Sequence, residues 1–245
     1  MADAKTLKSR LASGELDARL KEVYLSDKAV EDQKKRDAVI IDEFVRLFGD
    51  NDSIELFSAP GRTEVGGNHT DHNHGKVLAA SVDLDTVAAA AKRDDGIIVE
   101  KSFKFDALEV DISDLEVHTE EFGKSSGFIR GMCAGFKERG YNIGGFNAAS
   151  MSRVLSGSGL SSSAAYEVLI GTILNHLYND GKVSPVEVAK IAQYAENKYF
   201  GKPSGLMDQT ASSVPMRIFR TDARAQEMPL HPFAPKHPLQ VQLSC

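Results

Sequence analysis

The sequence contains no tryptophan, only two cysteines, and no apolar run that is long enough to span a bilayer. Cys133 and Cys245 are far apart, so they indicate neither a disulfide framework nor a CxxC metal motif. The first residues are charged and include no apolar segment of the kind found in a signal peptide. From these absences we expect a cytoplasmic protein with no membrane partner.

An excess of basic residues is also missing, because 35 acidic residues outnumber 29 basic ones and the net charge is −6. Affinity for nucleic acid depends on clustered lysine and arginine, so the composition argues against a nucleic-acid partner. The content of 42% hydrophobic and 26% charged residues is typical of a globular protein with a buried core. Nothing in the sequence indicates an oligomeric state.

Residue patterning divides the chain into three segments. Residues 1–50 are expected to be helical, and the apolar spacing over 38–48 predicts a helix that ends at Gly49. Residues 51–214 mix strand and helix patterns, which predicts an α/β (α+β) fold. Residues 215–245 hold five of the eight prolines and show no helical or strand period, so we expect a divergent tail there.

Within the middle segment the first strands are short. The expected strands are residues 54–57, 77–82, 86–91 and 97–99. The first should end at the Ala-Pro-Gly sequence that contains Pro60, before a polar loop that reaches Gly75. The last two should form a hairpin through the Arg-Asp-Asp-Gly turn that ends at Gly96.

Helix patterns follow in the second half of this segment. One helix is expected over residues 129–137, and another should begin near Ser162 after an extended stretch. The sequence Ser-Pro-Val-Glu from Ser184 to Glu187 has the residues of a capping box, with proline at the first helical position. The helix that it starts should end at Gly201.

The most informative stretch is Gly-Ser-Gly-Leu-Ser-Ser-Ser, residues 157–163, which we call the Gly-Ser loop. Small residues let backbone N–H groups close around an anion, and the positive end of the following helix faces the same point. The loop has no Walker lysine, and Ser162 replaces the third glycine of a dinucleotide motif. It does not fit the GxSxG elbow of hydrolases either. A flexible linker is the remaining alternative, but the loop lies between an apolar strand and an alanine-rich helix.

A second polar stretch, Gly-Arg-Thr-Glu-Val-Gly-Gly-Asn-His-Thr-Asp-His, covers residues 61–72. Charged and hydrogen-bonding groups between glycines suit a polar ligand, although a solvated loop is the plain alternative. Histidines at 69, 72 and 74, with Asp71, also raise the possibility of a metallohydrolase. No second cluster of such residues completes a two-metal site downstream, so we do not favour that interpretation.

The third stretch, residues 196–209, places Glu196 near the end of a helix and Asp208 just after a Pro/Gly turn. Two carboxylates separated by a sharp turn can face one pocket. One could hold Mg²⁺ through oxygen, and the other could accept a proton from a hydroxyl. Two exposed surface acids would be the alternative if this stretch stood alone.

Together the three stretches resemble the GHMP kinases, and within them the galactokinases. That family reads roughly GRxNxIGEHTDY, PxGxGLSSSA and AExxxxGxPxGxMDQ, in this order. Here the segments are GRTEVGGNHTDH, LSGSGLSSSAA and AENKYFGKPSGLMDQ, and the resemblance covers about residues 54–214. It implies the GHMP-kinase N-terminal domain, similar to the second domain of a small-subunit ribosomal protein, without the ferredoxin-like C-terminal domain.

The resemblance also implies roles for individual residues. ATP phosphates would lie against the Gly-Ser loop, which consists of Gly157, Ser158, Gly159, Leu160, Ser161, Ser162 and Ser163. Asp208 would be the base that deprotonates the anomeric hydroxyl of the sugar, and Arg62 would steady it. Mg²⁺ would be held by Ser163 and Glu196. The sugar would be bound by Asn68, His69, Thr70 and Asp71.

This sequence departs from the family pattern at several positions, which are Glu64, Gly66, Asn68, His72 and Leu155. We expect phosphorylation of galactose by ATP, and Asn68 in place of a family glutamate makes another sugar, such as galacturonate, the first alternative. A sensor that binds sugar and ATP without turnover is the second, but Ser162 to Ala165 are all present, which favours an enzyme. Without a C-terminal domain, we expect this chain to be inactive or nearly so.

Overall fold

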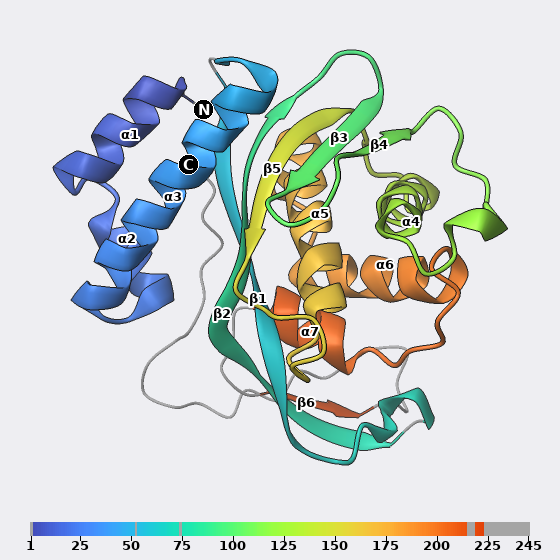
Figure 1. The fold of residues 1–245 in the computed structure, drawn as a ribbon. Helices are drawn as coiled ribbons and strands as arrows, with labels where there is room; N and C mark the ends of the chain where they lie inside the picture. Colours follow the sequence, from blue (N-terminus) through green and yellow to red (C-terminus); the bar gives the residue numbers. More distant parts are fainter. Residues whose placement is uncertain (1, 52, 74, 215–218, 223–245) are drawn as a thin grey trace.

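The computed structural model describes residues 2–51, 53–73, 75–214 and 219–222. Their central element is a six-stranded sheet in the order β1-β2-β5-β3-β4, with β6 also paired to β2 (Figure 1). The strands are β1 (Glu55–Gly66), β2 (Lys76–Lys92), β3 (Ile97–Ser102), β4 (Leu108–Asp111), β5 (Phe146–Ser152) and β6 (Phe219–Asp222). No helix within the described ranges is both long enough and apolar enough to cross a membrane.

The first two strands are longer than the sequence predicts. β1 does not stop at Pro60 but continues to Gly66, so the first six residues of the expected polar loop belong to a strand. The register with β2 shifts between Pro60 and Arg62. A proline is tolerated here because β1 is the first strand in the sheet order and the irregularity absorbs its missing N–H. Similarly, the two strands expected over 77–91 form the single strand β2.

The predicted hairpin between β2 and β3 is wrong. β5 lies between them, antiparallel to β2 and parallel to β3, while β3 forms its antiparallel pair with β4. Parallel strands need a long crossover connection, and the segment between β4 and β5 supplies it with helix α4 (Ser125–Glu138). The pairing of β2 with β5 joins residues about 60 positions apart, so no local turn signal indicates it.

Helices cover both faces of the sheet (Figure 1). One face carries α1 (Ala4–Ser13), α2 (Asp17–Tyr24) and α3 (Asp27–Phe48), and the other carries α4, α5 (Ser162–Asn179), α6 (Pro185–Lys198) and α7 (Met207–Ser213). The apolar run in β2 fits this arrangement because Val87 and Ala89 pack against the first group, whereas Ala88 and Ala90 pack against the second. A strand that is buried on both faces has a continuous run of apolar residues, not an alternation of apolar and polar residues.

Several helix boundaries agree with the local signals, although α3 begins well before residue 38, where the predicted helix starts. α3 begins after Ser26, whose side chain accepts a hydrogen bond from the N–H of Ala29, and it ends before Gly49. Ser184 caps α6 by accepting from the N–H of Glu187. The second half of the expected capping box is replaced by an ion pair, because the Glu187 carboxylate lies 2.8 Å from Nε of Arg139.

The segment expected to lack regular structure contains a short strand. β6 pairs in antiparallel register with the first residues of β2, from Lys76 opposite Asp222 to Ala79 opposite Phe219. The expectation of no regular structure after residue 214 is therefore wrong for residues 219–222. The remainder of the proline-rich tail lies outside the described residues.

A buried polar cluster fastens the first helices to the sheet. Asp85 of β2 accepts hydrogen bonds from the Tyr24 hydroxyl and the Ser58 hydroxyl, both at 2.6 Å, and forms a short ion pair with Arg36. Arg36 also donates to the carbonyl of Met151 in β5 at 2.8 Å. Removal of either charge would leave the other buried without its partner, which makes this cluster a strong constraint on how α3 docks.

Replacing Asp37, which lies beside this cluster on α3, should flatten the pH dependence of stability. Burial raises the pKa of Asp37 from 3.8 to about 7. Between about pH 4 and about pH 7 the folded chain therefore holds a proton that the unfolded chain has released. The free energy of unfolding should fall with rising pH by up to about 1.4 kcal/mol per pH unit across this window, and Asp37→Asn should remove that slope.

Urea unfolding at several pH values measures this slope. The asparagine of the variant can keep the hydrogen bond from Nε2 of Gln33, which is 2.6 Å from Oδ1 of Asp37. The exposed Asp32 on the same helix provides a matched control, and Asp32→Asn should leave the slope unchanged. Equal slopes in the wild-type chain and the Asp37→Asn variant would contradict the assignment.

Candidate active site

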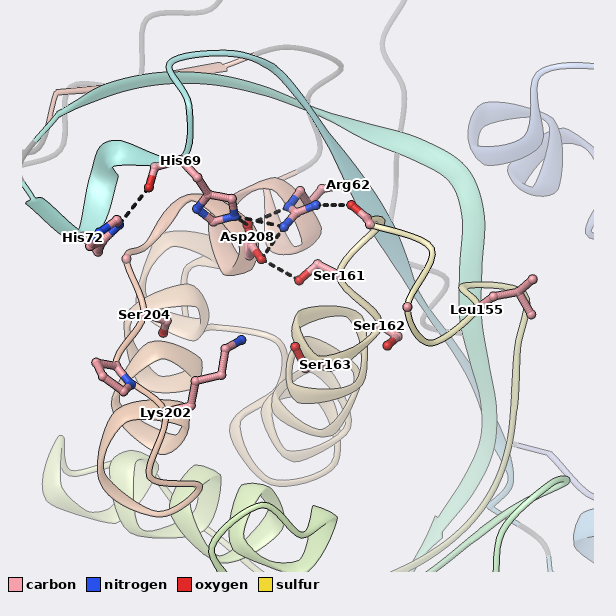
Figure 2. A pocket seen from close by; sticks show the side chains of 14 residues that line it. Arg62, His69, His72, Leu155, Ser161, Ser162, Ser163, Lys202, Ser204 and Asp208 are labelled. Atoms are coloured by element: carbon pink, nitrogen blue, oxygen red, sulfur yellow. Dashed lines mark hydrogen bonds and ion pairs between the residues drawn. The ribbon is translucent and has the colours of Figure 1, made fainter.

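A pocket of about 420 Å³ lies where β1, the start of α5 and the start of α7 come together. Its walls come from three stretches of sequence that are far apart in the chain (Figure 2). The lining residues are Arg62, His69, His72, Leu155, Gly157, Gly159, Ser161, Ser162, Ser163, Lys202, Pro203, Ser204, Gly205 and Asp208. The three motifs identified in the sequence therefore contribute to a single site.

The glycines of the Gly-Ser loop adopt a backbone conformation that costs glycine little. Gly157 and Gly159 have φ angles of 76° and 77°, and Ser161 is in the same left-handed region at 56°. Ser161 is the N-cap residue of α5 but makes no side-chain capping hydrogen bond. The first N–H groups of a helix have no partner within the helix, so the start of α5 presents donors and a positive dipole end at the pocket.

Arg62 reaches into the pocket because β1 passes very close to the Gly-Ser loop. A side chain at Gly61 would place its Cβ 2.8 Å from the carbonyl oxygen of Leu160, so only glycine permits this approach. The N–H of Arg62 donates to that same carbonyl at 2.9 Å, and its guanidinium donates to the carbonyl of Gly159 at 2.5 Å. Two glycines and an arginine thus fix the strand against the loop.

The guanidinium of Arg62 also forms a bidentate pair with Asp208. Nε and Nη2 of Arg62 each lie 2.6 Å from a different carboxylate oxygen, and the Ser161 hydroxyl donates to Oδ2 of Asp208 at 2.6 Å. Figure 2 shows these three side chains pointing toward one another. Both members of the pair are largely buried, with side-chain exposures of 9% for Arg62 and 16% for Asp208.

The electrostatic environment keeps Asp208 ionised. Burial by itself raises the pKa of this carboxyl. The hydrogen bonds and charge of Arg62 and the hydrogen bond from Ser161 lower the pKa by more than burial raises it. The net result is a pKa below the usual 3.8. At neutral pH the site therefore contains a carboxylate that is held in one orientation by three donors.

His69 links this pair to the polar stretch after β1. Its Nε2 lies 3.2 Å from Oδ1 of Asp208, and its Nδ1 lies 3.2 Å from Oδ1 of Asp71. The other oxygen of Asp71 accepts from the N–H of Met207 at 2.8 Å, next to Asp208 in sequence. A Cβ at Gly205 would lie only 1.9 Å from this oxygen, so the glycine leaves the space that Asp71 occupies.

Behind the pocket lies a second polar cluster, made of Glu167 on α5, Glu196 on α6 and Gln209 on α7. Nε2 of Gln209 donates to Oε2 of Glu196 at 2.6 Å and reaches Oε2 of Glu167 at 3.5 Å. All three side chains are buried. Burial raises the pKa of Glu167 well above its usual value, and the charge of Glu196 raises it further, so we expect Glu167 to be the neutral member.

Lys202 connects this cluster to the pocket. Its Nζ lies 2.8 Å from Oε1 of Glu196, while its side chain lines the pocket opposite Ser163 (Figure 2). Partial burial lowers the pKa of Lys202, but the hydrogen bond and charge of Glu196 raise it by more, and the net pKa is above the usual value. The pocket thus contains an ammonium group in addition to the guanidinium of Arg62.

The structure brings some of the predicted site residues together and leaves others apart. Those that line the pocket are Arg62, His69, Gly157, Gly159, Ser161, Ser162, Ser163 and Asp208. Ser158, Leu160, Asn68, Thr70, Asp71 and Glu196 do not contribute to its lining. Asn68 is exposed, and the Thr70 hydroxyl donates to the carbonyl of Gly67. The roles inferred for these residues remain predictions.

Several residues that the fold places at the site have no role predicted from the sequence. Lys202 and Gly205 lie in the segment between Glu196 and Asp208. The local sequence does not indicate which residues of this segment line the pocket. Glu167 falls on the helix after the Gly-Ser loop, within a largely apolar sequence. A charged residue in such a sequence is the one signal that could have drawn attention to it.

The proposed pair of metal ligands does not form an open site. Ser163 lines the pocket, but both carboxylate oxygens of Glu196 already accept hydrogen bonds, from Lys202 and Gln209. Within the part of the chain that the structure describes, no group of three or more His, Cys, Asp or Glu residues has the arrangement of a metal site. His74, considered as a ligand from the sequence, is outside that part.

Two family models match the chain. The galactokinase galactose-binding signature matches residues 42–92, and the N-terminal domain of the GHMP kinases matches residues 127–214. Arg62 and His69 fall within the first match, and the Gly-Ser loop, Lys202 and Asp208 fall within the second. Both models therefore contribute residues to the same pocket.

Proteins with similar sequences are also described as galactokinases. The chain is 37% identical over 175 residues to a galactokinase of Clostridium beijerinckii, which covers 71% of this chain and 44% of that protein. It is 34% identical over 169 residues to a galactokinase of Clostridium tetani, with coverage of 69% and 43%. The chain spans less than half of the length of these relatives.

Among solved structures, the galactokinase of Lactococcus lactis complexed with galactose matches with a TM-score of 0.72 and 31% identity, covering 81% of this chain and 52% of that one. The mevalonate kinase of Methanococcus jannaschii matches with a TM-score of 0.61 at 15% identity, covering 75% and 57%. The second similarity concerns the fold alone.

Proposed function

Because the chain belongs to the GHMP kinase family, with galactokinases as relatives, we propose that its pocket serves the transfer of a phosphoryl group from ATP to the anomeric hydroxyl of galactose. The observation that carries this proposal is the buried Arg62–Asp208 pair facing the Gly-Ser loop. A loop suited to binding phosphates and a carboxylate suited to accepting a proton line the same cavity of about 420 Å³.

The phosphates of ATP would lie against the Gly-Ser loop. The first N–H groups of α5, which have no partner within the helix, and the side chains of Ser162 and Ser163 lie at this end of the pocket. Backbone donors and a helix N-terminus favour negative charge, and their positions are set before the ligand arrives. Phosphoryl transfer depends mainly on such positioning and charge stabilisation.

The sugar hydroxyl would attack from the side of Asp208. A new bond forms between the sugar oxygen and the γ-phosphorus, the bond from that phosphorus to the β–γ bridging oxygen breaks, and Asp208 takes the hydroxyl proton. Because its pKa is lowered, Asp208 is a weak base that accepts the proton as the attack proceeds. Arg62 would hold the carboxylate in place and offset negative charge on the transferring group.

The sugar-binding residues are less closely defined. His69 is the one predicted sugar ligand that lines the pocket, whereas Asn68, Thr70 and Asp71 do not. Asp71 contacts both the His69 ring and the N–H of Met207, so it would also help to position these neighbours. Galactose is the proposed substrate because of the matched galactose-binding signature, and galacturonate is the alternative that Asn68 suggests.

Mg²⁺ is expected as the partner of ATP from the resemblance to the family. Ser163 would be the ligand that faces the pocket. The Glu196 carboxylate already accepts hydrogen bonds from Lys202 and Gln209. The proposed reaction therefore includes no step in which Glu196 acts as a metal ligand.

Binding and turnover can be measured separately on this chain. Isothermal titration calorimetry with galactose and with ATP tests the pocket, and ADP release together with phosphorus NMR of the sugar product tests the reaction. A panel that includes galacturonate and glucose defines the substrate class. If the chain binds neither galactose nor ATP and releases no ADP with any sugar, the proposal is wrong. Binding of both ligands without turnover is expected both for the sensor and for a kinase segment that is inactive by itself, as the sequence predicts for this chain.

A further inference from the structure

The Glu196 carboxylate, inferred from the family resemblance to be a metal ligand, has an ammonium group as its partner in this chain. We propose that Lys202 supplies positive charge to the phosphate end of the pocket in place of part of the charge that a divalent cation would bring. The inference rests on the proposed function, because it places the phosphates of ATP against the Gly-Ser loop.

The geometry leaves Glu196 with little capacity for a further cation. Its side chain is only 3% exposed, Oε1 accepts from Nζ of Lys202 at 2.8 Å, and Oε2 accepts from Nε2 of Gln209 at 2.6 Å. A metal ion bound to this carboxylate would have to displace one of these donors. Displacement of Lys202 would also place two positive charges next to each other in a partly buried site, which is unfavourable.

Lys202 itself is directed toward the ligand space. Its side chain is 57% exposed even though it is paired, and it lines the pocket together with Ser162 and Ser163. Figure 2 shows its amino group extended across the pocket toward Ser163. An ammonium group has three N–H donors, and Glu196 uses one of them. The remaining donors are available to phosphate oxygens, for which lysine is a common ligand.

The prediction is that ATP binds to this chain without a divalent cation and that Lys202 is responsible. Calorimetry in EDTA should give a dissociation constant within about threefold of that in excess Mg²⁺. Lys202→Met should weaken binding in EDTA by about 10- to 100-fold, the range expected for loss of one charge-assisted hydrogen bond. Mg²⁺ should restore much of this loss, because the Glu196 carboxylate is then open to a cation.

A matched control is available at the end of helix α6. Lys198 lies four residues earlier, is half exposed, and pairs with Glu138 outside the pocket. Lys198→Met should leave the affinity for ATP unchanged both in EDTA and in Mg²⁺. Thermal unfolding of each variant checks that the fold is retained.

A second measurement does not involve ATP. Electron paramagnetic resonance with Mn²⁺ alone should detect no tight site in the wild-type chain and a new site in Lys202→Met. The double variant Lys202→Met with Glu196→Gln should lose that site again, because the carboxylate is then absent.

The outcomes separate this inference from the proposed function. If ATP binding by the wild-type chain requires Mg²⁺ and Lys202→Met behaves in the same way, the inference is overturned while the proposed function stands. If ATP does not bind under any condition but Mn²⁺ binds only after Lys202→Met, the competition at Glu196 is correct and the proposed function fails. A tight Mn²⁺ site in the wild-type chain would overturn the inference directly.

Discussion

Asp208→Asn should lower the rate of the proposed phosphoryl transfer to galactose by about 10²- to 10⁴-fold, because it removes the group proposed to accept the proton of the attacking hydroxyl. Asparagine has almost the same shape but is a very poor base. One of its terminal atoms becomes a donor that faces donors from Arg62 or Ser161. Affinity for ATP should change far less than the rate, because the Gly-Ser loop is untouched.

The measurement is single-turnover formation of ADP and sugar phosphate, with calorimetry for each ligand. Asp83, an exposed aspartate on β2, is a suitable control, and Asp83→Asn should keep the wild-type rate. A variant at Asp208 that turns over at close to the wild-type rate would exclude this residue as the base. Loss of ATP affinity that matches the loss of rate would show that Asp208 acts in binding instead.

Arg62→Met should destabilise the chain by about 3–5 kcal/mol at neutral pH. The methionine side chain fills a similar volume but leaves the carboxylate of Asp208 buried with only Ser161 and His69 near it. The variant also loses the hydrogen bond to the Gly159 carbonyl that fixes the Gly-Ser loop. We therefore expect weaker ATP binding in addition to the loss of stability.

The pH dependence of this effect identifies its cause. In the wild-type chain the pKa of Asp208 is lowered, so its contribution to stability is present above the unfolded pKa and is lost as the pH falls through the folded pKa. Without Arg62, burial is no longer offset and the folded pKa should rise. The difference in unfolding free energy between the wild-type chain and Arg62→Met should then shrink as the pH falls toward about 4.

A double-mutant cycle gives the coupling between the two residues. The combination of Arg62→Met and Asp208→Asn should be less destabilised than the sum of the single variants, because no unpaired charge remains. Arg46 on α3 provides the control, since its ion pair with Glu43 is exposed and Arg46→Met should cost less than about 1 kcal/mol. Additive effects at Arg62 and Asp208 would contradict a direct energetic link.

Several features could be predicted from the sequence because their causes are local. The N-cap at Ser184 and the start of α5 at Ser162 each follow from a few neighbouring residues. The glycines of the Gly-Ser loop indicate positive φ angles, and both Gly157 and Gly159 adopt them. The order of the three motifs also predicted the family that the comparisons then showed.

Other features depend on contacts between distant segments, for which no local pattern exists. β5 separates β2 from β3 because α4 packs under the sheet and returns the chain parallel to β3, whereas the sequence shows only a turn and a following strand. β1 continues past Pro60 because its edge position removes the need for an N–H at that residue. In both cases the neighbouring elements of the sheet, not the local sequence, determine the position or the length of the strand.

The same division applies to the site. Residue types and spacing alone singled out the Gly-Ser loop and the carboxylates of Glu196 and Asp208, whereas the role of Arg62 beside Asp208 came from the resemblance to the family. The approach of β1 at Gly61 brings Arg62 to Asp208, and the turn before α7 brings Lys202 to Glu196. Side-chain direction and hydrogen-bond partners depend on packing in three dimensions, so the pairing of Lys202 with Glu196 emerged only from the tertiary structure.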